Sequence, residues 1–192
     1  MDLGQTGTRE KILAAAYRLF YREGFSRVSV DAIAEATGVT KRTIYYHFKS
    51  KDDIVADVLN AQHDYVLGRF KAWAGPRETP LNQVIENLFL QLTDWADGDN
   101  YMGSGFTRIS TELADRPGHP ARLAASAHKT MTEKWLSELL HDHGLERNGE
   151  IARQVMVLIE GSMSLALIHG DTSYFQAAGR AAGELVSLSE KT

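Results

Sequence analysis

The 192-residue sequence contains no cysteine. This absence excludes a disulfide framework, a thiolate nucleophile and a cysteine-ligated zinc site. Long hydrophobic runs are also missing, since no apolar stretch approaches the roughly 18–20 residues of a membrane-spanning helix. The N-terminus lacks the pattern of a signal peptide. We therefore expect a cytoplasmic protein without a membrane segment.

The net charge of −4 is unevenly distributed along the chain. Residues 1–50 hold eight Lys or Arg against five Asp or Glu, whereas the remaining residues hold 13 basic and 20 acidic side chains. The sequence therefore predicts a small basic head on a larger acidic body. An excess of three positive charges is common over fifty residues, so only a motif within this segment gives it meaning.

Apolar residues recur with a helical period along nearly the whole chain, which predicts an all-α protein. Gly24 can end the first helix, and Ser29, Thr40 and Ser50 can cap the next three. The expected helices form a three-helix head, a long connecting helix and a body of about five helices. They span residues 8–23, 30–36, 40–47, 50–73, 81–95, 106–113, 121–143, 148–168 and 173–189. In the helix over 121–143, the expected inward face consists of Leu123, Ala127, Met131, Trp135 and Leu139.

The segment 29–48 reads SVDAIAEATGVTKRTIYYHF, which predicts two short helices joined by a tight turn at Gly38. This is the pattern of a helix-turn-helix, whose second helix enters the major groove of DNA. Glycine at the turn permits a positive φ that a branched residue resists. Ile33, Ala34, Val39 and Ile44 supply a small core. The second helix presents polar and aromatic side chains outward: Lys41, Arg42, Thr43, Tyr45 and Tyr46.

Over about residues 8–60 the sequence resembles the TetR family of transcriptional regulators. The resemblance is carried by Ile12 to Phe20, Gly24-Phe25, Val30-x-x-Ile33-Ala34-x-x-x-Gly38-Val39 and Thr40-Lys41-x-Thr43-Ile44-Tyr45-Tyr46-His47-Phe48-x-x-Lys51. It implies a homodimeric, ligand-responsive DNA-binding protein, usually a repressor. It also implies a DNA-binding domain over 6–66 and a ligand-binding and dimerisation domain over 76–192. Val28 departs from the threonine that is frequent in the family, and Ser29 is the neighbouring candidate for that phosphate contact.

The helix-turn-helix supplies the expected DNA contacts. Lys41 is expected to meet a phosphate or a guanine edge, and Arg42 is the candidate base reader. By family analogy Tyr46 is the stronger phosphate contact of the two tyrosines. His47 and Phe48 are expected to pack the head onto the fourth helix. The full set of expected DNA-binding residues is Ser29, Val30, Thr40, Lys41, Arg42, Thr43, Tyr45, Tyr46 and Lys51.

The predicted body holds many aromatic and methionine side chains, which favour either a core or a permissive ligand pocket between helices. The family resemblance favours a pocket for a small hydrophobic or aromatic effector. Charged residues in otherwise apolar helices are either its polar anchors or partners in surface salt bridges. The expected pocket residues are Phe89, Trp95, Phe106, Arg108, Glu112, Met131, Trp135, Glu160 and Met163.

The last two predicted helices are rich in apolar and small residues, and the helix over 148–168 is apolar almost all round. A buried hairpin within one chain is one explanation. A two-fold dimer interface is better supported, because one head carries one recognition helix and needs a second. The expected interface residues are Ile151, Val155, Leu158, Gly161, Ser162, Tyr174, Ala178, Ala181 and Leu185.

No motif points to catalysis, a cofactor or a metal. Gly103-Ser104-Gly105 lacks the third glycine and the preceding strand of a dinucleotide site, and there is no P-loop or hydrolase elbow. His141 and His143 would point to different faces of a helix. We therefore expect a homodimeric regulator that binds a palindromic operator, usually as a repressor released by an effector. The alternatives are a constitutive DNA-binding protein without an effector and, less favoured, a small-molecule enzyme.

Overall fold

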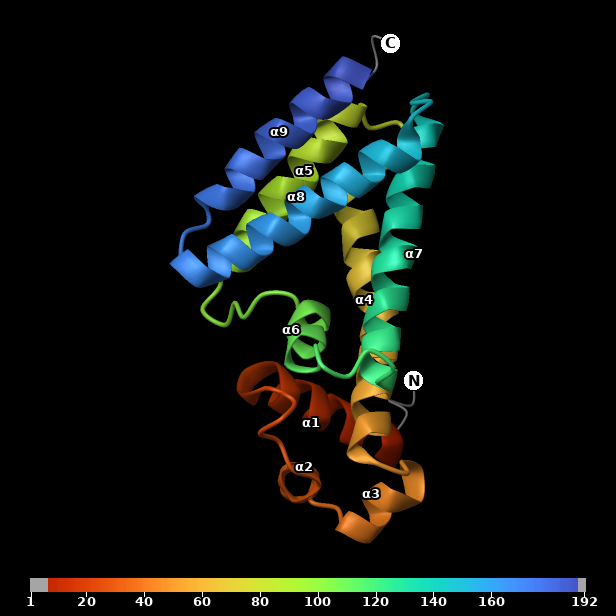
Figure 1. Cartoon of the computed structure of the whole chain (residues 1–192), viewed down its shortest axis with the longest axis vertical. Helices are drawn as coiled ribbons and strands as arrows, with labels where there is room; N and C mark the ends of the chain where they lie inside the picture. Colours follow the sequence, from red (N-terminus) through yellow and green to blue (C-terminus); the bar gives the residue numbers. More distant parts are fainter. Residues whose placement is uncertain (1–6, 190–192) are drawn as a thin grey trace, which may run out of the picture. The chain divides into compact units, whose positions relative to one another are not determined.

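The computed structural model describes residues 7–189. Over this range the chain forms nine α-helices and no strand, which confirms the all-α class (Figure 1). The expected boundaries agree with the observed ones to within one or two residues. The helices are α1 (Thr8–Glu23), α2 (Val30–Thr37), α3 (Lys41–His47), α4 (Lys51–Ala74), α5 (Leu81–Ala96), α6 (Gly105–Glu112), α7 (Pro120–Asp142), α8 (Asn148–His169) and α9 (Ser173–Ser189).

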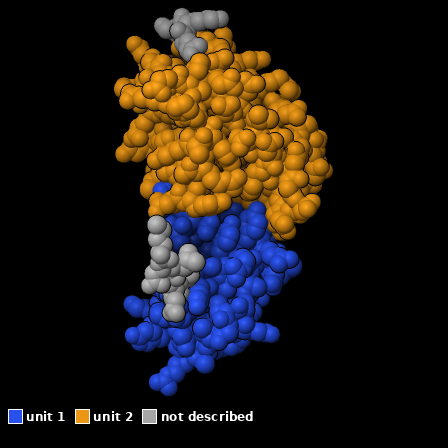
Figure 2. Space-filling model, turned by 180° about the vertical axis from the view of Figure 1, so that it is seen from behind, with its two compact units in different colours: residues 1–63, 105–128 blue, residues 64–104, 129–192 orange. Residues whose placement is uncertain are grey.

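The chain divides into two compact units (Figure 2). One, which we call the head unit, contains residues 1–63 and 105–128, and the other, the body unit, contains 64–104 and 129–192. The segment 105–128 thus groups with the helix-turn-helix, although it follows the first body segment in sequence. The two domains expected over 6–66 and 76–192 stay predictions. Their residue 6 and residues 190–192 lie outside the described residues.

Short polar side chains fix the start of the head helices where the sequence predicts them. The Ser29 hydroxyl accepts a hydrogen bond from the Ala32 amide at 3.1 Å, and the Thr40 hydroxyl accepts one from the Thr43 amide at 3.1 Å. These caps satisfy amides that have no partner within the first helical turn. Between them Gly38 ends α2 with a φ of 70°, a value that glycine adopts without strain. The predicted helix-turn-helix geometry is confirmed.

In the body unit, α9 packs against both α5 and α8. Its core includes Leu88, Ile159 and Phe175, each at most 2% exposed. Gly179 permits α9 to approach α5 closely, because a Cβ atom there would lie 2.9 Å from the Cβ of Phe89. A larger residue at this position would force the two helices apart.

The inward face of α7 differs from the expected one. Leu123 and Met131 are 60% and 41% exposed, and Ala127 is also exposed. The buried positions are Ala121, Ala125, His128, Thr132, Leu136 and Leu140. The physical reason is that His128 and Thr132 occupy the buried stripe, so a search for apolar residues alone misplaces it. Trp135 and Leu139 lie at its edge and are half-buried.

By length and composition, α8 is long and apolar enough to cross a membrane, contrary to the expectation that no apolar stretch reaches this length. In the structure 44% of its most apolar window is buried within the protein. Ile151, Val155 and Ile159 of this helix belong to the body core. Because a core helix satisfies the same criterion, the apolar composition of α8 is accounted for by burial on one side.

Candidate DNA-binding surface

The recognition helix α3 has a buried face and a strongly exposed face. Ile44 is fully buried, whereas Tyr46 is 85% exposed and Tyr45 is 48% exposed. Arg42 is also exposed. Two neighbouring exposed tyrosines beside a cation form a patch on one helix, so this face of α3 is a candidate binding surface. Phe48 is buried and packs within the head, as expected.

The N-terminal end of α3 presents hydroxyl groups together with a positive helix dipole. The Thr40 and Thr43 hydroxyl oxygens lie 2.9 Å apart, so one hydroxyl donates to the other. Ser29 stands exposed at the corresponding end of α2. A helix N-terminus lined by hydroxyl donors suits a phosphate group.

Lys41 does not stand free on this surface. Its ammonium group lies 2.9 Å from the Asp31 carboxylate on α2, and both side chains are largely exposed. The hydrogen bond and the negative charge of Asp31 raise the pKa of Lys41 above its ordinary value. Lys41 therefore stays charged, and a DNA phosphate would have to compete with Asp31 for it.

We expect Asp31→Asn to strengthen operator binding by about 3- to 10-fold, because it releases Lys41 in both subunits from an exposed and therefore weak ion pair. The slope of affinity against salt concentration should stay that of wild type, since Lys41 neutralises the same phosphate once the complex has formed. Glu35→Gln is the matched control, because it removes the same charge from an exposed position of α2. An equal gain in both variants in a fluorescence-anisotropy titration would show a general charge effect and contradict competition for Lys41.

Two of the expected DNA-binding residues point into the protein. Val30 is 8% exposed, because the first apolar side chain after the Ser29 cap packs into the head core. The Lys51 ammonium group donates to the main-chain carbonyls of Phe25 and Val28 at 2.9 and 3.1 Å, and it lies over the Phe25 ring. Burial lowers the pKa of Lys51, while the charges of Asp52 and Glu112 oppose that shift. Lys51 therefore holds the α1–α2 loop, residues 24–29.

Two exposed cations beside the helix-turn-helix were missed by the sequence analysis. Arg27 precedes the Ser29 cap and Lys49 follows Phe48. Both are exposed in the structure. Their positions at the two ends of the motif suit contacts with the DNA backbone, and their signal in the sequence was their charge next to the motif.

Asp52, in the first turn of α4, has two basic side chains as neighbours. The Asp52 carboxylate accepts a hydrogen bond from the Arg116 guanidinium at 3.0 Å. It also lies 3.1 Å from Nε2 of the buried His119. The Ala121 amide donates to Nδ1 of His119, which places the ring proton on Nε2, the nitrogen nearest to Asp52. Burial opposes the ionisation of Asp52, but the neighbouring His119 ring and Arg116 guanidinium outweigh it and lower the pKa of Asp52.

The lowered pKa of Asp52 predicts a pH-dependent contribution to stability. A carboxyl group whose pKa falls on folding stabilises the protein above its ordinary value, 3.8, and this contribution is lost as the pH falls below it. We expect Asp52→Asn to lower the unfolding midpoint by about 2–4 °C at neutral pH. That difference should shrink in thermal melts below pH 3.8. A constant difference between the two proteins across this range would contradict the assignment.

The expected dimer interface is partly buried within a single chain. Ile151, Val155, Ser162 and Ala178 are at most 8% exposed, so they offer no surface to a second chain. Tyr174, Leu158 and Leu185 are half-buried, and Gly161 and Ala181 are exposed. The helical period places other exposed apolar or small residues on the same faces as Gly161 and Ala181. The exposed stripe of α8 and α9 consists of Val157, Gly161, Leu165, Ile168, Ala177, Ala181 and Leu188.

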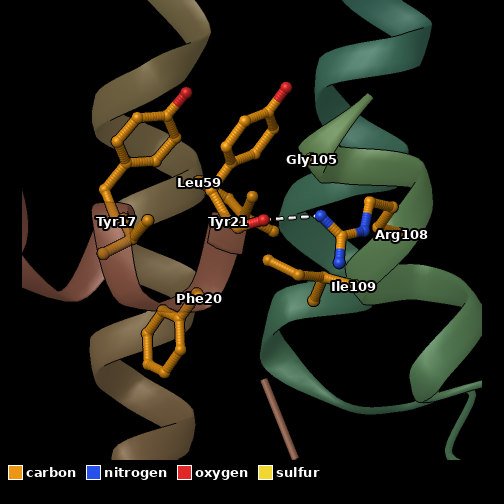
Figure 3. A pocket seen from close by; sticks show the side chains of 8 residues that line it. Tyr17, Phe20, Tyr21, Leu59, Gly105, Arg108 and Ile109 are labelled. Atoms are coloured by element: carbon orange, nitrogen blue, oxygen red, sulfur yellow. Dashed lines mark hydrogen bonds between the residues drawn. The ribbon is translucent and has the colours of Figure 1, made fainter. Parts of the chain in front are cut away.

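A small pocket lies in the head unit between α1, α4 and α6 (Figure 3). The rings of Tyr17 and Tyr21 stack with centroids 5.8 Å apart, and the Arg108 guanidinium donates to the Tyr21 carbonyl. The free volume of about 20 Å³ holds a water molecule but no drug-sized ligand. The lining residues are Tyr17, Phe20, Tyr21, Val58, Leu59, Gly105, Arg108 and Ile109.

Arg108 belongs to this pocket, but the other expected pocket residues are not among its lining residues. Phe106 and Glu112 serve contacts within the head unit: Phe106 stacks on His128, and Glu112 binds main-chain amides. Met131 is 41% exposed on α7.

The remaining expected pocket residues lie in the body unit, where each has a structural contact. Phe89 and Met163 belong to the core, and Glu160 pairs with Lys129. Trp135 meets Phe70 edge-on, and Trp95 meets Tyr101 in the same way.

Among the described residues, no group of three or more His, Cys, Asp or Glu side chains is placed to hold a metal ion. The two ring nitrogens of His143 instead lie 2.8 and 3.0 Å from the carbonyl oxygens of Leu139 and Thr79. His143 thus ties the end of α7 to the loop before α5.

Comparison with known proteins places the helix-turn-helix in a family. Residues 12–58 match the family described as bacterial regulatory proteins, tetR family. The HTH-type transcriptional regulator TtgR of Pseudomonas putida is 42% identical over 57 residues, which are 30% of this chain and 27% of that protein. The match therefore spans about a quarter of the length of this relative.

Two further comparisons extend over most of the chain. The HTH-type transcriptional regulator UidR of Escherichia coli is 26% identical over 165 residues, covering 85% of this chain and 79% of that protein. A TetR-family regulator from Streptomyces coelicolor, SCO4454, superposes with a TM-score of 0.83 at 22% identity and covers 95% of both chains. The motif, the length of these matches and the shared fold agree: the helix-turn-helix is that of the TetR family of transcriptional regulators, and the chain has the fold of a TetR-family regulator.

Proposed function

We propose that this protein is a cytoplasmic repressor that binds a palindromic operator as a homodimer and is released by a small hydrophobic effector. The exposed face of α3, with Tyr46 at 85% exposure beside Lys41 and Arg42, carries the proposal. The cations and tyrosine hydroxyls of this face suit the phosphates and base edges of a major groove.

Dimerisation follows from the size of the recognition element. One α3 helix reads a single half-site, and a two-fold dimer presents two helices about one turn of DNA apart, roughly 34–36 Å, or a multiple of that distance. The exposed stripe of α8 and α9 supplies the surface through which two chains would form the dimer. It combines apolar side chains such as Val157 and Ile168 with the small residue Gly161, which permits close helix approach.

The effector is proposed to act at the pocket of the head unit. The lining is mainly aromatic and aliphatic, and Arg108 bridges α6 to the carbonyl at the C-terminal end of α1. Because the pocket holds only a water-sized group, a flat hydrophobic molecule must open it and draw Arg108 away from Tyr21. A carboxylate or carbonyl on the effector would replace the lost acceptor.

An enzymatic role has no support in the comparisons, whose named proteins are transcriptional regulators. A constitutive DNA-binding protein without an effector is the remaining alternative. It would use the same α3 surface and differ only in its response to small molecules.

The proposal is tested by titrating selected operator DNA in the presence and absence of aromatic carboxylates that bind in isothermal calorimetry. Effector release requires an operator affinity that falls about 5- to 150-fold, a coupling of about 1–3 kcal/mol. Reciprocity requires operator DNA to weaken ligand binding by the same factor. Compounds that bind the protein but leave operator affinity unchanged would favour the constitutive binder.

A further inference from the structure

The α1–α2 loop of the head unit is bound by a carboxylate from a segment far along the chain. Glu112, the last residue of α6, accepts hydrogen bonds from the amides of Phe25 and Ser26 at 3.1 and 2.9 Å. Each carboxylate oxygen takes one amide, so a single side chain satisfies two neighbouring donors of the loop. Hydrogen bonds to an ionised acceptor are the stronger kind.

The sequence of the loop accommodates this contact. Gly24 adopts a φ of +92°, and a Cβ atom at this position would lie 2.9 Å from an oxygen of Glu112. A side chain here would strain the backbone and displace the Glu112 carboxylate from its present position. Gly24 is therefore required both for the turn and for the approach of Glu112.

Lys51 holds the same loop from its carbonyl side. Its ammonium group binds the carbonyls of Phe25 and Val28, while Glu112 binds the amides of Phe25 and Ser26. The loop is thus fixed between a carboxylate on α6 and an ammonium group on α4. It leads directly into Ser29, the cap of α2, and α2 carries α3 through the turn at Gly38.

We propose that Glu112 is a positioning residue for operator recognition: by binding the loop amides it sets the orientation of α2 and hence of the recognition helix. This inference rests on the proposed function. The DNA-reading part of the protein then includes α6 as well as the N-terminal segment. Without Glu112 the loop samples several positions, and only a fraction of the molecules present α3 in the binding orientation. The apparent affinity falls by that fraction.

Glu112→Ala in the full chain is expected to weaken operator binding about tenfold. The slope of affinity against salt concentration should stay that of wild type, because Glu112 neutralises no phosphate. Glu112→Gln should fall between the two, since its single oxygen accepts only one of the two amides. Asp115→Asn is the matched control, because it removes an exposed charge three residues away from the same segment.

Amide hydrogen exchange separates a positioning role from a general loss of stability. Exchange should accelerate at Phe25 and Ser26 in Glu112→Ala, while the α8 and α9 amides exchange as in wild type. In a double-mutant cycle, Gly24→Ala should weaken operator binding less in the Glu112→Ala background than in wild type, because the clash with the carboxylate is gone.

Three results would overturn the inference: wild-type operator affinity in Glu112→Ala, an equal change in Asp115→Asn, or unchanged exchange at Phe25 and Ser26. Each presupposes that wild-type protein binds an operator. If wild type binds no DNA sequence specifically, the proposed function itself has failed, and the exchange measurement still decides whether Glu112 holds the loop.

Discussion

Replacement of Lys41 and Tyr46 by alanine is expected to weaken operator binding by at least about 100-fold and to leave the fold and the dimer intact. Both side chains are exposed on α3 and make no contribution to its core, where Ile44 is buried. Loss of Lys41 from both subunits should lower the slope of log affinity against log salt by about two, or 0.9 for each phosphate contact. Circular dichroism and sedimentation check the fold and the assembly, and anisotropy titrations at several salt concentrations give the slope.

The control for this variant removes the same residue types elsewhere. Lys71→Ala with Tyr65→Ala changes exposed residues of α4 that lie in the body unit. It should bind the operator as wild type does. Equal operator affinity in the α3 variant and in wild type would show that α3 is not the recognition helix.

A charge at Gly161 is expected to separate the dimer and thereby reduce operator affinity by at least about 100-fold. In one chain the site tolerates a side chain, because nothing lies within 4 Å of a Cβ atom built there. In a closely packed two-fold interface the same Gly161→Glu side chain would be buried without a partner. An uncompensated buried charge costs about 3–5 kcal/mol. Sedimentation velocity should show a monomer that keeps wild-type helix content.

Gly68→Glu is the matched control for this experiment, since Gly68 also lies within a helix and its Cβ direction is equally open. It should remain a dimer. If Gly161→Glu sediments as the wild type does, the interface lies on another surface, and the exposed stripe of α8 and α9 has a different partner.

Local signals made the helix-turn-helix predictable. Ser29 and Thr40 cap α2 and α3 through hydrogen bonds to amides three residues away, and Gly38 turns the chain between them. These interactions act within a few residues, so the sequence alone contains both partners. The residues from Val30 to Phe48 have the spacing of the TetR family, and this resemblance predicted that α3 reads DNA.

The partners of two charged side chains depend on tertiary contacts, which the sequence does not show. Lys51 was expected on DNA, yet it binds two carbonyls of the α1–α2 loop. Glu112 was expected in a ligand pocket, yet it binds two amides of that loop across more than 80 residues of chain. The sequence pattern around Lys51 and Glu112 does not reveal whether the partner of the charged group is solvent, DNA or a distant main-chain group.

The prediction of the buried face of α7 was wrong for a related reason. The expected inward face followed the apolar residues Leu123 and Met131, but the buried stripe contains His128 and Thr132. His128 stacks on Phe106 and lies 2.9 Å from a ring nitrogen of His63. Buried polar side chains with partners of this kind are invisible to a pattern of hydrophobicity.

The most direct test of the central claim is sequencing of the DNA fragments that the purified wild-type protein retains from a random library. If α3 of a homodimer reads an operator, the enriched fragments share an inverted repeat whose half-sites lie about one helical turn, or a multiple of one turn, apart. The Lys41→Ala/Tyr46→Ala variant should enrich no such repeat. Retention of a single unrepeated motif, or of no motif at all, by the wild-type protein would contradict the account.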